Sequence, residues 1–198
     1  LASSVSSKTG PWDEDFLVVC PGGDGATNAK IDNLVGNVEI NKRAADQPLQ
    51  TSGLIDKAQQ FGATHWARTA DATTVQSAAW TVEALVKYPA PPSGNLIALS
   101  AWHLHSIAAT LWSARPNIYK GAKNYRYFDQ SAWMTIKDGS WHHVAFINPG
   151  PAQSDITSSA MLLDGVAQSV YSTVSSGSMD STAGNPFYVG SAYNTDAA

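Results

Sequence analysis

The sequence is short of the features that mark several common classes of protein. It has a single cysteine, Cys20, so no disulfide can form within the chain, and we expect this residue to be a small buried hydrophobe. Charged residues make up only 14% of the chain and aromatics make up 10%, which is the opposite of the balance found in disordered chains. The net charge of -4 argues against a general nucleic-acid binder, because such proteins need a basic face to neutralise phosphates.

Long apolar runs are also absent from the sequence. No stretch approaches the roughly 20 apolar residues of a membrane-spanning helix, and no signal peptide is evident. Because the chain begins at Leu1 rather than Met, we expect a processed product or the ordered part of a longer protein. The length of 198 residues suits one large β domain, which can bury a sufficient core without disulfide staples.

What the sequence does contain, from Phe16 onward, is a series of short apolar or alternating runs separated by Gly, Pro, Asn, Asp and Ser. Residues 80–88 alternate in the way expected of a strand with one buried face, and Asp164-Gly165 is a strong hairpin signal. No stretch of eleven or more residues shows a helical period. The predicted strands are residues 16–20, 57–61, 80–88, 95–102, 105–113, 125–136 (with a bend), 141–147, 160–163, 166–171 and 187–190. This pattern predicts an all-β fold, an antiparallel two-sheet jelly-roll sandwich over residues 15–198, preceded by an extended arm over residues 1–14.

Five short segments occur in an order that is typical of one protein family. They are residues 53–62 (GLIDKAQQFG), 80–87 (WTVEALVK), 139–145 (GSWHHVA), 163–165 (LDG) and 185–191 (NPFYVGS). Together they resemble the laminin-G-like branch of the concanavalin A-like lectin/glucanase superfamily, although Leu85 stands where the family usually has Trp. The resemblance covers residues 15–191 and implies a jelly roll. Members generally add a closing strand after the last segment, so we expect that edge to be covered by a segment beyond this sequence, by the arm or by a partner.

We predict no catalytic activity for this chain. Some members of the superfamily are glucanases, which place carboxylates at i, i+2 and i+4 of one strand so that an acid and a nucleophile flank one glycosidic bond. Glu83 is alone on its predicted face, and Glu39 has only the amides Asn37 and Asn41 nearby. A nucleophile-elbow sequence is likewise absent.

Two pairs of histidines were considered as metal ligands. His142 and His143 are adjacent on a predicted strand and therefore point to opposite faces, so they cannot bind one metal together. The resemblance implies that this segment is a core strand in which the histidine satisfies local hydrogen bonds. His103 and His105 would share a face, but the sequence shows no third ligand for zinc.

Oxygen ligands for a hard cation gather in the early loops. The candidate metal ligands are Asp24, Asp32 and Asn33. Residues 32–37 (DNLVGN) are similar to an Asp-x-x-Gly-Asn turn of the family, and the resemblance implies that this turn contributes to calcium binding. An ordinary Asx-type turn is the alternative. Calcium is therefore the one cofactor that the sequence suggests.

Residues 115–130 (RPNIYKGAKNYRYFDQ) interleave tyrosines with cationic and amide side chains. Aromatic rings stack on sugars while cations and amides bond to hydroxyls, so this mixture suits a glycan, especially an acidic one, or a protein partner. A polar hairpin without a ligand is the alternative, and single-stranded nucleic acid is disfavoured by the acidic balance of the chain. The predicted ligand-binding residues are Tyr119, Lys120, Asn124, Tyr125, Arg126 and Tyr127.

Two classes of function follow from these features. The first is a non-catalytic module that binds a glycan or a surface protein, in an extracellular, cell-surface or virion-surface setting. The second is a structural assembly protein, such as a virus capsid decoration or fibre subunit, in which the jelly roll forms a homo-oligomer or a larger assembly. The tyrosine-rich segment favours the first, and the arm and the open edge favour the second. We expect binding rather than assembly, without nucleic acid and without a membrane span.

Overall fold

The computed structural model describes residues 30–31, 39–42, 47–54, 57–61, 66–72, 79–88, 97–101, 108–111, 116–119, 124–150, 152–176 and 186–190. One set of strands forms a large sheet: β1 (Lys30–Ile31), β2 (Ile40–Lys42), β5 (Trp66–Ala72), β7 (Ile97–Ala101), β8 (Ala108–Leu111), β9 (Pro116–Tyr119), β10 (Asn124–Phe128), β14 (Val170–Ser175) and β15 (Pro186–Gly190). A second sheet contains β6 (Trp80–Lys87), β11 (Trp141–Asn148), β12 (Ala160–Leu163) and β13 (Val166–Ala167), and β3 (Leu49–Ser52) pairs with β4 (Lys57–Gln60) alone.

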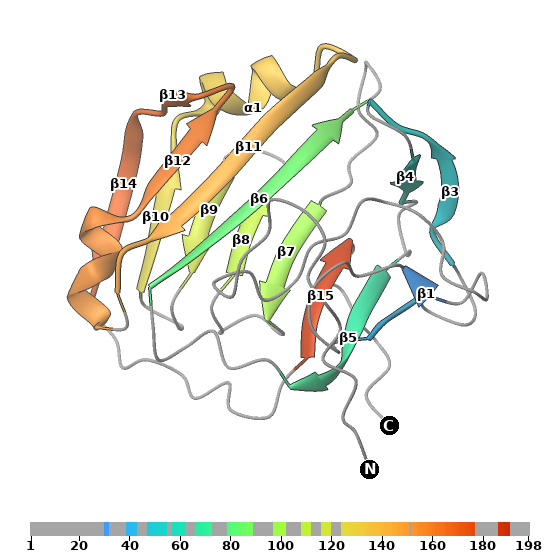
Figure 1. Ribbon diagram of the computed structural model, residues 1–198. Helices are drawn as coiled ribbons and strands as arrows, with labels where there is room; N and C mark the ends of the chain where they lie inside the picture. Colours follow the sequence, from blue (N-terminus) through green and yellow to red (C-terminus); the bar gives the residue numbers. More distant parts are fainter. Residues whose placement is uncertain are drawn as a thin grey trace, which may run out of the picture.

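The two larger sheets form the layers of a sandwich. The nine-stranded sheet has the order β1-β2-β5-β15-β7-β8-β9-β10-β14, and the four-stranded sheet has the order β13-β12-β11-β6. Neighbouring strands in the described residues pair antiparallel; β11, for example, pairs with both β6 and β12 in this way. Figure 1 shows the four-stranded sheet in front of the nine-stranded one. The predicted antiparallel two-sheet jelly roll is confirmed, and the separate β3–β4 hairpin was not foreseen.

The hydrophobic core lies between these two layers. Strand β6 alternates as predicted, with Val86 buried and Lys87 exposed. Phe128 of β10 and Phe146 of β11 meet across the sandwich, with ring centroids 6.4 Å apart. Burial of each such side chain contributes about 1.5–3 kcal/mol to stability, so this cluster is the main source of the sandwich's stability. The cluster comprises Val86, Tyr88, Ile118, Phe128, Ala132, Ile136, Val144, Phe146, Ile156, Met161 and Leu163.

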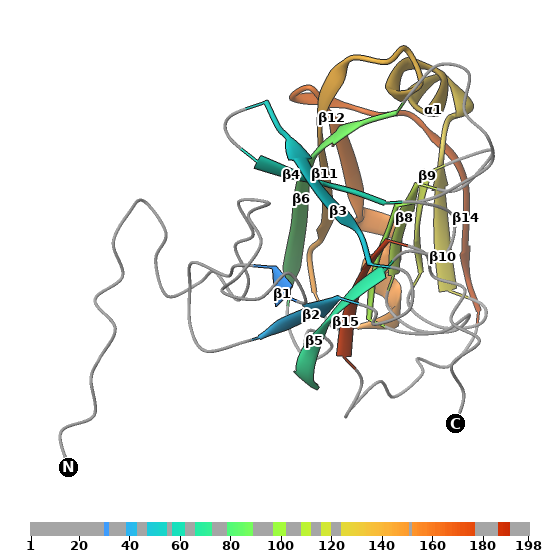
Figure 2. The ribbon, with the colours of Figure 1, turned by 90° about the vertical axis from the view of Figure 1, so that its right-hand side faces the viewer.

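A helix replaces the second half of the strand predicted at residues 125–136. Strand β10 ends at Phe128, and α1 occupies Gln130–Ile136. Asp129 caps the helix, because its Oδ1 accepts a hydrogen bond from the Ser131 backbone N–H at 3.1 Å. Ala132 and Ile136, four residues apart, bury one face of α1 in the core, and Figure 2 shows α1 at one end of the two layers. At seven residues the helix is too short for its period to be recognised in the sequence.

The strand predicted at residues 166–171 is also divided in two. The Asp164-Gly165 hairpin is confirmed, because both residues have positive φ (51° and 79°), as a two-residue turn of the right twist requires. The returning strand β13 ends at Ala167, and the chain then passes to the other layer as β14, which pairs with β10. The Asp129 backbone N–H donates to Ser169 O at 2.9 Å, which fixes this crossover beside the start of α1.

Seven other strand predictions are confirmed in position. They correspond to β4, β6, β7, β8, β11, β12 and β15. Strands β1, β2, β3 and β5 were not predicted, and β9 forms a hairpin with β10 inside the segment 115–130. The predicted arm at 1–14 and the strand at 16–20, with Cys20, lie outside the described residues, so the domain boundary after residue 14 stays a prediction.

The β3–β4 hairpin differs from the rest in its burial. All four residues of β3 are exposed, and Leu49 and Leu54 have 62% and 58% of their surface accessible. The base of the hairpin is held by the buried Lys42, whose Nζ donates to Pro48 O at 3.0 Å. In Figure 1 the hairpin lies on the opposite side of the molecule from β14.

Candidate functional site

Strand β10 carries four of the six predicted ligand-binding residues, and its pleat separates them into two pairs. Phe128 points into the core, so Asn124 and Arg126, at two-residue spacing from it, share its inward face. Tyr125 and Tyr127 therefore face outward, away from the four-stranded sheet. The four predicted residues on β10 therefore do not share one face of the sheet.

The inward pair, Asn124 and Arg126, packs within the fold. Asn124 is fully buried, and Arg126 donates from Nη1 to Ile156 O, at 3.3 Å, in the short 3-10 helix η1 (Gln153–Ser158). The Arg126 Nε is buried and has no hydrogen-bond acceptor among the described residues, and burial lowers the pKa of this guanidinium. Arg126 thus braces η1 against β10 and does not join the outward tyrosines.

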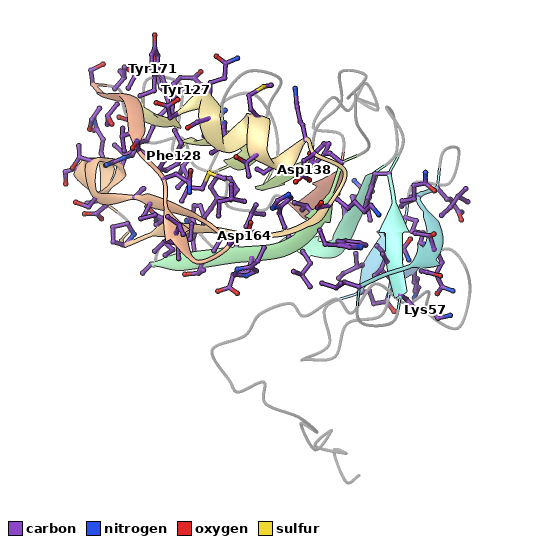
Figure 3. All side chains as sticks on the ribbon, turned by 90° about the horizontal axis from the view of Figure 1, so that it is seen from above. Lys57, Tyr127, Phe128, Asp138, Asp164 and Tyr171 are labelled. Atoms are coloured by element: carbon purple, nitrogen blue, oxygen red, sulfur yellow. The ribbon has the colours of Figure 1, made fainter. Side chains whose placement is uncertain are left out.

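The outward pair belongs to a group that we call the tyrosine surface: Tyr125, Tyr127 and Tyr171. The rings of Tyr125 and Tyr127 meet edge to face, with centroids 5.0 Å apart. Tyr171 of β14 lies at an irregularity where the pairing register with β10 shifts, and 60% of it is exposed. Figure 3 shows Tyr127 and Tyr171 on the same side of the sheet, with Phe128 directed to the interior.

The other two predicted ligand-binding residues, Tyr119 and Lys120, precede β10 in the sequence. The backbone of Tyr119 on β9 pairs with Tyr125, and the Tyr119 side chain and Lys120 lie outside the described residues. Tyr171 is the residue that sequence reasoning missed. Tyr171 is the one large aromatic of the strand predicted at residues 166–171, so the sequence did contain a signal for it. The crossover that brings Tyr171 beside β10 was not predictable from the sequence.

The predicted metal ligands Asp24, Asp32 and Asn33 lie outside the described residues, as do His103 and His105. Within the part of the chain that the structure describes, no group of three or more His, Cys, Asp or Glu side chains is placed to hold a metal ion. Among the same residues, no helix has the length and apolar character needed to cross a membrane.

A second cluster is formed by Asp138, His142 and Asp164, and Figure 3 labels its two aspartates. His142 of β11 is buried on the inward face with Val144. Its Nδ1 lies 2.8 Å from Asp164 Oδ2, and its Nε2 lies 3.0 Å from Asp138 Oδ1. Both carboxylates are tied to backbone as well, since Asp164 Oδ1 accepts from His143 N–H at 2.9 Å and Asp138 Oδ1 accepts from Ser140 N–H at 2.6 Å.

These contacts shift the ionisation of all three side chains. The hydrogen bond that His142 donates to Asp164 is the largest cause that raises the pKa of His142 above its ordinary 6.5, with the bond to Asp138 adding to it and burial opposing it. Hydrogen bonding to His142 in turn lowers the pKa of Asp164 and of Asp138 below 3.8. The cluster therefore favours a cationic imidazole between two carboxylates.

The neighbouring His143 points to the opposite face, as predicted. Its Nε2 lies 3.2 Å from Glu83 Oε2 on the exposed face of β6. The expectation that histidine in this segment satisfies local hydrogen bonds is confirmed for His142. Its partners were not foreseen, because Asp138 and Asp164 are brought together only by the fold.

The fold and these surfaces define an all-β jelly-roll module with two antiparallel layers. A family model described as the concanavalin A-like lectin/glucanases superfamily matches residues 61–198, more than half of the chain. The chain belongs to this superfamily, and the laminin-G-like resemblance is confirmed. Comparison with curated proteins and with solved structures finds no match.

Proposed function

We propose that this chain is a non-catalytic binding module that takes a glycan, or another ligand displayed on a surface, on the tyrosine surface. The observation that carries the proposal is the outward placement of Tyr125 and Tyr127 beside the exposed Tyr171. A tyrosine offers an apolar ring, which stacks on the apolar face of a sugar, and a hydroxyl, which hydrogen-bonds the hydroxyls of the sugar. Membership of a superfamily that contains many binding modules supports the same reading.

The inward position of Arg126 narrows the class of ligand. Its guanidinium braces η1, and among the described residues the tyrosine surface is built from aromatic and neutral side chains. Ser172 and Val174 of β14 lie opposite Tyr127 and Tyr125 in the sheet register and share their face. This composition favours a neutral glycan over the acidic one that the sequence suggested.

The proposed absence of catalysis is supported by the contacts of three carboxylates in the described part of the chain. Glu83 pairs with His143, and both Asp138 and Asp164 hold His142. Hydrolysis of a glycosidic bond needs two carboxylates that face one substrate. We place the module in an extracellular, cell-surface or virion-surface setting, where such ligands are displayed.

The test is a glycan array carrying neutral, sialylated and sulfated glycans, followed by calorimetric titration of the best neutral ligand. We expect Tyr171→Ala to weaken binding at least about tenfold, as for an aromatic anchor. Met134→Ala is the matched control, because Met134 is exposed to a similar extent (61%) and lies on α1, outside strands β10 and β14. Binding that is unchanged in Tyr171→Ala, or absent from the whole array, would contradict the proposal.

Calcium stays part of this proposal because its candidate ligands are Asp24, Asp32 and Asn33 in the early loops. The array and the titration are therefore run in calcium and in chelator. Loss of binding in chelator, restored by calcium and not by magnesium, is the expected result for a calcium-supported site. Equal binding in both buffers would remove calcium from the account and leave the tyrosine surface unaffected.

The second candidate is an assembly protein, and the exposed β3–β4 hairpin is the observation that favours it. Leu49 and Leu54 present apolar surface on a two-stranded sheet outside the sandwich. Sedimentation analysis of the purified chain tests this candidate. An oligomer that dissociates in the double variant Leu49→Ser/Leu54→Ser would support assembly, whereas a monomer at high micromolar concentration would exclude it.

A further inference from the structure

We propose that Asp138, His142 and Asp164 form a proton-dependent clamp that holds the β12–β13 turn against the loop between α1 and β11, and that the clamp is closed in mildly acidic surroundings and opens as they become alkaline. The clamp contains none of the residues of the tyrosine surface and goes beyond the proposed function.

The two hydrogen bonds of His142 depend on how many of its ring nitrogens carry a proton. Both ring nitrogens of His142 face carboxylate oxygens, at 2.8 Å and 3.0 Å. A carboxylate can only accept, so both contacts are hydrogen bonds only when both nitrogens carry a proton. A neutral ring would keep one bond and place a lone pair against the other carboxylate. The geometry therefore fits the imidazolium, and loss of one proton removes one side of the clamp.

Among the described residues, His142 is the side chain that contacts both carboxylates. The groups that face His142 are Asp138 from the loop before β11 and Asp164 from the β12–β13 turn, while β6 presents Val86 in register with it. On the opposite face of β11, Glu83 contacts His143. Protonation of His142 thus decides whether the two carboxylates are bridged.

The clamp fixes the backbone of the β12–β13 turn. Asp164 has φ of 51°, a left-handed backbone that non-glycine residues rarely adopt, and it is held there by bonds to His143 as well as by His142. The turn leads through β13 to the crossover, whose Ser169 O accepts from the Asp129 N–H at the start of α1. Opening of the clamp is therefore expected to loosen residues 164–169 before the core between the sheets.

The direction of the pH response follows from the shifts of the three groups. The raised pKa of His142 means that its contribution is complete below about 6.5 and is lost as pH rises through the higher folded value. The lowered pKa of Asp138 and Asp164 means that their contribution is present above 3.8 and is lost as pH falls through the lower folded values. The clamp is closed between these limits.

The test is an NMR titration of the histidine ring nitrogens in the whole chain from pH 4 to pH 10. We expect His142 to be doubly protonated at pH 6 and to titrate above 6.5. Protection factors against amide hydrogen exchange at residues 164–169, which correct for the intrinsic rise of exchange with pH, should fall through the same midpoint. A midpoint at or below 6.5, or a single protonated nitrogen at pH 6, would overturn the proposal.

Two variants separate the clamp from ordinary packing. Asp138→Asn keeps a side chain of the same shape on an exposed loop, so the chain should fold, and the His142 midpoint should move toward 6.5. His143→Gln is the matched control on the neighbouring residue and should leave the His142 midpoint unchanged. An unmoved midpoint in Asp138→Asn, or an equal shift in both variants, would contradict the clamp.

Discussion

The two ends of this molecule differ in how they are held together. At one end, η1, α1 and strands β10, β11 and β12 share one cluster of buried apolar side chains. At the other end, the β3–β4 hairpin has its first strand fully exposed and is tied to the body through the bond from Lys42 to Pro48 O. Strand pairing alone therefore does not make an element stable. Two antiparallel strands are marginal in water unless they bury a face.

The largest expected difference comes from truncating one apolar side chain at each end. Phe146→Ala should cost about 3–5 kcal/mol of unfolding free energy, because Phe146 is fully buried against Phe128. Leu49→Ala should change it by no more than about 0.5 kcal/mol, because Leu49 is exposed. Urea unfolding at constant pH measures both. Similar losses in the two variants would mean that the hairpin contributes to the core.

The turn that joins β12 to β13 offers the next largest effect. Gly165→Ala should cost about 1–2 kcal/mol, because the φ of 79° is unfavourable for any residue with a Cβ even though the space around it is open. Gly165→Asn is the control, since asparagine tolerates this backbone better. If alanine and asparagine were equally tolerated in thermal unfolding, backbone strain at this turn would be excluded as a determinant.

Removal of the helix cap at the buried end is expected to have a smaller effect. Asp129→Ala should cost about 1 kcal/mol, because the Ser131 backbone N–H loses its acceptor. Asp129→Ser retains a capping oxygen and should recover most of this loss. Chemical unfolding of the three proteins tests the cap, and an Asp129→Ala variant as stable as the parent would show that packing alone defines α1.

The smallest effect on overall stability is expected at the exposed end. A Cβ at residue 53 would collide with the backbone carbonyl oxygen of Lys57, so Gly53→Ala should disrupt the β3–β4 turn. Hydrogen exchange should then become fast in β3 and β4, while the unfolding midpoint changes by less than about 0.5 kcal/mol. A large loss of global stability would show that the two ends fold as one unit.

The sequence predicted the strands that bury one face and are bounded by strong turn residues. Strand β6 shows the alternation clearly, and Asp164-Gly165 marks its hairpin by the backbone that these residues favour. Helix α1 was missed because a seven-residue element with two buried positions has too short a period to recognise. The crossover after Ala167 was missed because nothing local to residues 166–171 specifies that β14 joins the other sheet.

The candidate sites were less predictable than the fold for a related reason. The richness of residues 115–130 in tyrosines and cations pointed to β10 as a candidate binding strand, but the two-residue period of β10 turns Asn124 and Arg126 inward. Tyr171 and the partners of His142 come from distant segments and meet only after the layers pack. Composition indicates which residues can bind, and the pleat and the topology decide which of them face the same side.

The most direct test of the central claim is a map of where a ligand binds. The glycan that ranks first on the array would be titrated into the isotope-labelled chain while backbone amide signals are followed. We expect the largest changes in the amide signals of β10 and β14 around Tyr125, Tyr127 and Tyr171. The amide signals of β3 and β4 should not change. Shifts confined to the β3–β4 hairpin, or to the face of the four-stranded sheet that carries His143, would contradict the central claim.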